Sequence, residues 1–325
     1  MDKYFIITID TEGDNIWKRV TTKDGMRDIA VENAKDIERF QALCDKYGFV
    51  PTYLVNYEMA NAEPFVSLAK EWVREGRCEI GMHMHAWNTP PIYDLPFNQK
   101  GHNPFAGEYP RKILFQKMQI MTEVLEKTFG VRPTSYRGGR WYIDAWYIEA
   151  LRKLGYIVDC SVTPGVSWSK AIGNVKYGPD YSDFPDCVCT IEGKKLIRYK
   201  RQDVRGSILE VPPTIIASPL VKRIKKAIQN PEKIKDIYHE RIWLRPNGSN
   251  LDDMLYIVDK IKNREYVEFM LHSSELMPGG SPVFKYEKSI EKLYQDLEVL
   301  FFKIAKERRG ISLSGYANML KNGNK

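Results

Sequence analysis

The sequence predicts an α/β protein with mostly parallel strands. Short apolar runs alternate with amphipathic helical segments through the first half of the chain, which is typical of strands joined by crossover helices. Polar residues stand at the ends of several predicted strands, and in a parallel barrel these ends meet on one face. Barrels and doubly wound sheets both fit the alternation.

The first half of the chain alternates strand and helix. Strands are expected where β-branched and aromatic residues cluster between turn residues. Helices are expected where apolar residues recur every three to four positions, and three of them stop at Gly48, Gly130 and Gly155. The predicted order is strand 4–9, helix 30–47, strand 50–55, helix 65–74, strand 79–85, helix 111–129, strand 134–137, helix 143–154 and strand 156–161.

The alternation breaks after Ser161 and returns near the C-terminus. The segments of this half are a long ordered loop at 163–186, a β-pair at 195–199 and 207–211, a mostly helical basic stretch at 222–262, strand 266–271, helix 286–308 and strand 311–313. There is no internal repeat and no flexible linker. We therefore expect one domain over residues 1–325, with an insertion at about 163–264.

Charge and composition limit the classes of function. The net charge is +7, and much of the basic excess lies between residues 194 and 235. A basic helix there could meet phosphates, lipid headgroups or nucleic acid, but no nucleic-acid signature accompanies it, and we interpret it as a solvated helix face. The five cysteines fit no disulfide scaffold, and the first apolar run is too short for a signal peptide or a membrane span. These features predict a cytoplasmic protein with reduced thiols.

Acids and histidines stand where strands end. Asp10 and Glu12 follow the first strand, and His83 and His85 close the third. Residues two apart on an extended chain share a face, so each pair can converge. Two carboxylates and two imidazoles suit a divalent metal such as Zn²⁺. Two further histidines, His102 and His239, are interpreted as surface residues.

Other residues fall on the same predicted face. Arg137 closes the fourth strand, Asp159 lies in the fifth, and His272 follows strand 266–271. Asp14 is a candidate ligand or substrate contact. Aromatic side chains near these strand ends could stack on sugar rings, although packing at the rim explains them equally well. These aromatic residues are Trp17, Trp87, Trp141 and Tyr142.

Five segments resemble, in order, the motifs of the polysaccharide deacetylases of the NodB-homology class (carbohydrate esterase family 4). FIITIDTE at 5–12 resembles T-F-D-D, EIGMH at 79–83 resembles E-I-G-x-H, and SYRGGRW at 135–141 resembles F-R-x-P-x-G. GYIVD at 155–159 stands in the place of the fourth motif, and LHS at 271–273 resembles the fifth. The resemblance spans about residues 4–284.

The resemblance implies a distorted (β/α) barrel of about seven or eight strands that removes an acetyl group from a glycan. It implies Asp10 as general base, Arg137 as the residue that holds Asp10, and His272 as general acid. A divalent metal, zinc first, would polarise the acetyl carbonyl. The expected metal ligands are Asp10, Glu12, His83 and His85. The expected substrate contacts are Asp14, Trp87, Arg140, Trp141 and Asp159.

Three positions depart from the family pattern. Thr11 stands in place of the usual second acid, Trp87 in place of the second histidine, and Gly139 in place of a proline. Glu12 and His85 are the candidate replacements for the two lost ligands.

The expected partner is a carbohydrate, either small or linked to a lipid or nucleotide, with no nucleic acid and no transmembrane segment. The sequence says nothing of the oligomeric state. One alternative is another metal amidohydrolase on the same scaffold, such as a deformylase or an allantoinase-like enzyme. A second alternative is a catalytically inactive glycan-binding protein.

Overall fold

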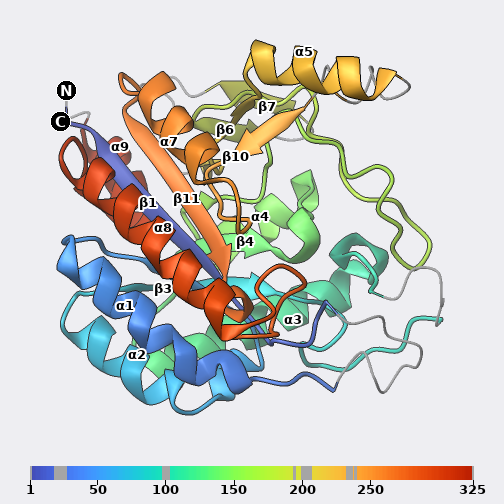
Figure 1. The fold of residues 1–325 in the computed structure, drawn as a ribbon. Coiled ribbons are helices and arrows are strands. Elements are labelled where there is room, and N and C mark those ends of the chain that lie inside the picture. The colour runs from blue at the N-terminus through green and yellow to red at the C-terminus, as the bar shows by residue number, and fades with distance from the viewer. Residues whose placement is uncertain are drawn as a thin grey trace.

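The computed structural model describes residues 2–17, 28–96, 103–192, 195–198, 207–231, 237 and 240–323. Within them the centre of the molecule is a ten-stranded sheet (Figure 1). Eight of its strands pair in parallel. They are β1 (Tyr4–Thr11), β2 (Thr52–Val55), β3 (Glu79–Met84), β4 (Ser135–Gly138), β5 (Val158–Asp159), β8 (Leu209–Glu210), β11 (Tyr266–His272) and β12 (Arg309–Gly310).

The remaining strands lie between residues 189 and 243. β6 (Cys189–Glu192) pairs antiparallel with β8 and with β7 (Lys195–Arg198). β9 (Ile215–Ala217) and β10 (Arg241–Trp243) form a separate antiparallel pair. The order of the main sheet is β11-β1-β2-β3-β4-β5-β8-β6-β7, with β12 also on β1.

Helices cover the outside of this sheet (Figure 1). They begin and end as follows: α1 (Ile37–Lys46), α2 (Phe65–Arg74), α3 (Arg111–Phe129), α4 (Ala145–Lys153), α5 (Leu220–Gln229), α7 (Leu251–Lys260), α8 (Glu287–Ala305) and α9 (Leu313–Asn322). No helix in the described part of the chain is long and apolar enough to cross a membrane.

The register of the parallel strands aligns their carboxyl ends. Asp10 at the end of β1 stands opposite His272 at the end of β11. His83 near the end of β3 stands opposite Arg137 in β4. Residues far apart in the sequence therefore meet at one end of the sheet.

The sheet curls into a distorted barrel. The gap between the segment after β8 and β11 is bridged by a few individual hydrogen bonds instead of a continuous strand pairing. The Thr214 amide donates to the Glu268 carbonyl at 3.1 Å, and the Glu268 amide donates to the Thr214 hydroxyl at 2.9 Å. The Tyr266 hydroxyl donates to the Pro212 carbonyl at 3.1 Å. The segment after β8 thus runs beside β11, which confirms the expected distorted (β/α) barrel.

Several predicted elements are confirmed and others are wrong. The helices at 65–74 and 111–129 have the predicted bounds. The β-pair predicted between 195–199 and 207–211 is wrong, because β6 lies between β7 and β8 in the sheet, and residue 199 is outside the described residues. The helical stretch at 222–262 contains β10, so it is not continuous.

The predicted helix at 30–47 and the predicted strand at 311–313 also differ from the structure. The helix expected from residue 30 begins as a 3-10 turn, η2 (Glu32–Asp36), before α1. Leu313 does not lie in a strand but begins α9, whose first turn is capped by the Ser312 side chain accepting from the Gly315 amide. The short strand before it, β12, ends at Gly310.

An aromatic cluster joins α8 to the two central strands. The ring of Phe301 in α8 lies 5.6 Å, centroid to centroid, from Phe5 in β1 and 5.6 Å from Phe269 in β11. Phe301 is 0% exposed, whereas its neighbour Phe302 is 55% exposed. The two adjacent phenylalanines therefore allow the effect of losing a packed ring to be compared with the effect of losing an exposed one.

Phe301→Ala should lower the free energy of unfolding by about 3–5 kcal/mol, because it opens a cavity against β1 and β11. Phe302→Ala should change it by less than about 1 kcal/mol, since that ring is largely in solvent. Urea unfolding followed by circular dichroism measures both. Equal losses in the two variants would contradict the described packing of α8.

Candidate functional site

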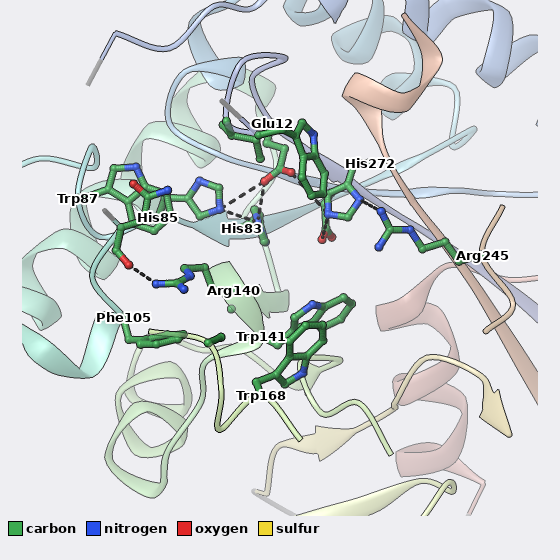
Figure 2. Close-up of a pocket in the computed structure, with 16 residues that line it drawn as sticks. Glu12, His83, His85, Trp87, Phe105, Arg140, Trp141, Trp168, Arg245 and His272 are labelled. Carbon is green, nitrogen blue, oxygen red and sulfur yellow. Dashed lines mark hydrogen bonds and ion pairs between the residues drawn. The ribbon is translucent and has the colours of Figure 1, made fainter. Parts of the chain in front are cut away.

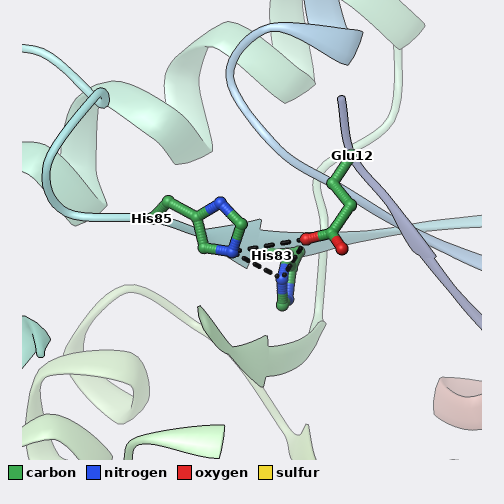
Figure 3. Close-up of side chains that lie close together, drawn as sticks. All are labelled: Glu12, His83 and His85. Atoms are coloured by element: carbon green, nitrogen blue, oxygen red, sulfur yellow. Dashed lines mark hydrogen bonds and ion pairs between the residues drawn. The ribbon is translucent and has the colours of Figure 1, made fainter. Parts of the chain in front are cut away.

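Three buried donor atoms meet at the carboxyl ends of β1 and β3 (Figure 3). Oε2 of Glu12 lies 3.2 Å from Nε2 of His83 and 3.3 Å from Nε2 of His85. The two imidazole Nε2 atoms are 3.1 Å apart. All three side chains are at least 96% buried. The donor atoms form a nearly equilateral triangle.

This triangle has the dimensions of a metal site. Ligand bonds of about 2.0–2.1 Å in a tetrahedral zinc site place neighbouring ligand atoms about 3.3 Å apart. Two imidazoles and one carboxylate with an open fourth position are a known catalytic zinc donor set. Within the described residues, Oε1 of Glu12 is buried without a hydrogen-bond partner. The residues present therefore fit a divalent ion.

The hydrogen bonding and burial of the two histidines also fit ligation. Burial lowers the pKa of His83, but the carboxylates of Asp10 and Glu12 outweigh it and raise the pKa above its usual value, so an ion at Nε2 would replace a proton there. Nδ1 of His83 lies 3.0 Å from the Arg137 carbonyl, so a neutral ring donates there and keeps the Nε2 lone pair for a metal. Burial lowers the pKa of His85 well below its usual value, so this ring is neutral. Trp87 stacks on the His85 ring at 4.3 Å and 14° and holds it in place.

Gly139 explains one departure from the family pattern. A Cβ at this position would lie 2.3 Å from Cδ2 of His85 and 2.6 Å from the Met84 carbonyl oxygen. Neither contact is tolerable, so a proline or any other side chain would displace the His85 ring. The glycine is therefore required by the position of His85.

Asp10 is held by a fully buried arginine. Nη1 of Arg137 donates to Oδ1 of Asp10 at 2.7 Å, and Nη2 donates to Thr8 Oγ1 at 2.8 Å and Glu268 Oε1 at 2.7 Å. Burial raises the pKa of Asp10, but the Arg137 charge outweighs it, and the pKa stays well below the usual value. Asp10 is thus ionised, with Oδ2 directed away from Arg137.

His272 faces the two acids of β1. Its Nε2 lies 3.6 Å from Oδ2 of Asp10 and 3.6 Å from Oε1 of Glu12. Its Nδ1 lies 2.9 Å from Nη2 of Arg245 and 3.5 Å from Oε2 of Glu275. Arg245 can donate to the neutral ring, and Glu275 can accept from the imidazolium. In the state with both nitrogens protonated, the Nε2 proton points at Asp10 and Glu12.

Half-buried Arg245 and buried Glu275 form a second ion pair behind His272. Nη2 of Arg245 donates to Oε1 of Glu275 at 2.8 Å, and Oε2 of Glu275 accepts from the His272 amide at 2.9 Å. Burial raises the pKa of Glu275, but Arg245 outweighs it, and the pKa falls to about 2. Arg245 was not singled out from the sequence. Its only signal is its place two residues after the short strand β10 and directly before Pro246.

These groups open into a pocket of about 310 Å³ with aromatic walls (Figure 2). This volume is at the lower end of the range typical of small-molecule sites. The Trp17 ring meets the His272 ring edge-on at 5.0 Å. The aromatic residues of the lining are Trp17, Trp87, Phe105, Trp141 and Trp168.

A strained turn places a cation on one wall. Arg140 and Trp141 have positive φ angles of 57° and 61°, which non-glycine residues seldom adopt. The Arg140 guanidinium lies 3.9 Å over the Phe105 ring and donates to the Ile172 carbonyl at 3.1 Å. Burial lowers the pKa of Arg140 to about 10, so it remains charged at neutral pH.

The structure brings together most of the residues expected from the sequence. Arg137 lies behind Asp10 instead of in the pocket lining. The expected residues that line the pocket are Asp10, Glu12, His83, His85, Trp87, Arg140, Trp141 and His272. His102 and His239 lie outside the described residues.

Three expected roles do not match the geometry. Asp10 is not part of the three-atom donor cluster, and its Oδ1 accepts from Arg137. Asp14 does not line the pocket, and its Oδ2 accepts from the Glu32 amide at 2.7 Å at the start of η2. Asp159 is fully buried below the pocket, where Oδ1 accepts from the Ser161 hydroxyl at 2.7 Å.

The fold is similar to that of several solved structures. A protein assigned as a polysaccharide deacetylase from Mycobacterium smegmatis matches over 99% of this chain and 92% of its own, at 12% identity and a TM-score of 0.56. A protein assigned as a glycoside hydrolase/deacetylase from Parabacteroides distasonis matches over 98% and 71%, at 11% identity and a TM-score of 0.57. Puue allantoinase matches over 98% and 89%, at 11% identity and a TM-score of 0.53.

At these identities the likeness shows a shared fold. The sequence matches no protein-family model and no curated protein. The chain therefore has a scaffold seen in both deacetylase and allantoinase structures.

Removing the buried arginine should make stability strongly pH-dependent. In Arg137→Met, Asp10 and Glu268 stay buried without their cation. The folded-state pKa of Asp10 then rises from well below its usual value to above the unfolded value of about 4, and that of Glu268, which burial already raises to about 7, rises further. The folded variant then keeps protons that the unfolded chain releases, and its stability falls as the pH rises. The loss relative to the parent protein should reach about 3–5 kcal/mol near neutral pH and be smaller near pH 5.

Urea unfolding at a series of pH values measures this trend. Arg152→Met is the matched control, because Arg152 pairs with Glu149 at 2.8 Å with about half of each side chain exposed. It should leave the unfolding midpoint nearly unchanged at every pH, because an ion pair this exposed is screened by solvent. A loss in Arg137→Met that does not vary with pH would count against the described pairing.

Proposed function

We propose that this protein is a metal-dependent hydrolase that removes an acetyl or similar acyl group from an amino sugar or glycan intermediate. The observation that carries the proposal is the triangle of Glu12, His83 and His85 next to the Asp10–His272 pair in one pocket. The ordered motif resemblance and the shared scaffold support it.

Glu12, His83 and His85 would hold the ion. Two nitrogens and one oxygen favour zinc among the common divalent metals. When bound, such an ion supplies Lewis acidity toward the acyl carbonyl and the attacking water.

Asp10 and His272 would move the protons. Ionised Asp10 accepts a proton from the attacking water at Oδ2. The His272 imidazolium donates its Nε2 proton to the leaving nitrogen or oxygen as the bond to the acyl carbon breaks. Asp10 then returns its proton to His272 across the 3.6 Å that separates Oδ2 from Nε2. The products are a free carboxylic acid and the deacylated sugar.

The pocket walls suit a sugar. Trp87, Trp141 and Trp168 offer ring faces and edges for the apolar side of a pyranose, and Arg140 offers a cation to a polar substituent. The small cavity fits a single sugar unit, carried free or on a lipid or nucleotide.

A second candidate is an amidohydrolase that cleaves another amide, as the similarity to Puue allantoinase suggests. The proton transfers would be the same, and only the acyl group and carrier would differ. A screen of N-acetylated sugars for acetate release, run beside allantoin and N-formyl sugars, separates the two candidates.

His83→Ala should lose most of its bound metal, because it removes one corner of the donor triangle. Elemental analysis of purified protein measures the stoichiometry. Asp14→Asn is the matched control, since this acid caps η2 away from the cluster, and it should keep the metal. Full metal occupancy in His83→Ala, or a metal-free parent protein, would refute the site, and the latter would favour an inactive glycan-binding protein.

His272→Ala should keep its metal and its fold while turnover falls by about 10²–10⁴-fold, the usual contribution of general acid catalysis. Metal content and rate must be measured on the same preparation. Loss of metal would make His272 a ligand instead of an acid. Near-normal turnover would leave it only a structural role.

A further inference from the structure

Helix α5 (Leu220–Gln229) presents its apolar side to solvent. Its large apolar residues are Leu220, Val221, Ile224 and Ile228, which share one face at helical spacing. They are 62%, 79%, 50% and 76% exposed, in that order, and no residue of the helix is buried. A surface helix of a globular protein ordinarily turns such a stripe toward the core.

The charged side of α5 faces the body of the protein. Nζ of Lys222 lies 2.5 Å from Oδ2 of Asp253 in α7, and Lys226 forms an ion pair with Glu240 beside β10. The helix lies at the edge of the molecule, at the top of Figure 1. The helix is therefore attached through its lysines. Its charged side faces the protein and its apolar side faces solvent, which is the reverse of the usual arrangement.

The charges around the stripe indicate what covers it. α5 has four basic residues and no acid. At about 3.6 residues per turn, Arg223 and Lys225 fall on opposite sides of the apolar stripe. An apolar stripe between cations is complementary to an anionic lipid surface, where acyl chains lie beneath a layer of phosphates.

The size of the stripe argues against a second copy as its partner. A ten-residue helix is about 15 Å long and about 10 Å wide, so one face offers about 150 Å². A stable protein interface needs about 800 Å² from each partner. The helix is also too short to span a bilayer, which takes about 20 residues. It suits a position in the plane of the headgroups.

We infer that α5 docks this protein on an anionic lipid surface, with Leu220, Val221, Ile224 and Ile228 inserted between headgroups and the flanking cations on phosphates. The groove between α5 and the body of the protein is lined by charges of both signs, among them Lys222, Asp253 and Arg245, and Arg245 also lines the candidate catalytic pocket. The apolar stripe lies on the other side of α5, so lipid docking would leave this groove uncovered. The inference does not depend on the reaction proposed above.

Vesicle flotation tests the inference. The parent protein should float with vesicles that contain phosphatidylglycerol and not with vesicles of phosphatidylcholine alone, and added salt should weaken the binding. Val221→Ser combined with Ile228→Ser should lower the partition coefficient about tenfold or more. Lys225→Glu should weaken binding to the anionic vesicles.

The matched control is Val299→Ser combined with Phe302→Ser, which removes two side chains of α8 that are 48% and 55% exposed. It should float like the parent protein. All four positions are exposed, so thermal unfolding should be nearly unchanged in both double variants.

Two outcomes would overturn the inference. One is equal flotation of the parent protein and the α5 double variant. The other is self-association of the parent protein without vesicles, measured by light scattering and lost in the α5 double variant, which would make this face a contact between copies of the chain.

Discussion

The structure depends on one buried guanidinium. Arg137 in β4 contacts Thr8 and Asp10 in β1, Glu268 in β11 and the carbonyl of Cys160 after β5, so it ties four parts of the barrel together from the inside. A cation with 0% of its side chain exposed persists only if its donors are matched by acceptors, and these acceptors are supplied by separate strands. Polar side chains around Arg137 therefore fill this part of the barrel interior, and Asp10, at the top of that group, also lines the candidate site. The same contacts that hold the strands in register fix the oxygen of Asp10 that faces His272.

The three departures from the family motifs fit one another. The Thr11 hydroxyl donates to the Ile9 carbonyl at 3.1 Å and makes no contact with the donor cluster, and the carboxylate of Glu12 stands there in its place. Trp87, in place of a histidine, stacks on His85, which supplies the second imidazole. Gly139 gives that imidazole its room. Together the three changes leave two imidazoles and one carboxylate within reach of one another, as the proposed metal site requires.

The sequence was most informative where local rules dominate. The helices at 65–74 and 111–129 have strong amphipathic periods and clear stops, and the acid and histidine pairs two residues apart were correctly expected on one face. The antiparallel strands β6 and β10 were missed, because strands of three or four residues are defined by partners far along the chain. Arg245 was missed for the same reason, since only tertiary structure brings it to His272. Asp14 and Asp159 were placed in the site by their position near strand ends, but each makes local hydrogen bonds to the backbone or hydroxyl of nearby turns.

The register of β1 has a consequence for synthesis of the chain. Thr8 bonds to Glu268 across a separation of 260 residues, and β1 lies between β2 and β11 in the sheet. At about 5–20 residues per second, a ribosome needs on the order of ten seconds or more to make the strand that completes this side of β1. During that time the nascent chain carries a strand with an unpaired edge and unmatched carboxylates, which is the kind of species that chaperones bind. The contact between Asp10 and His272 is consequently among the last to form, because no nascent chain that ends before His272 holds both residues.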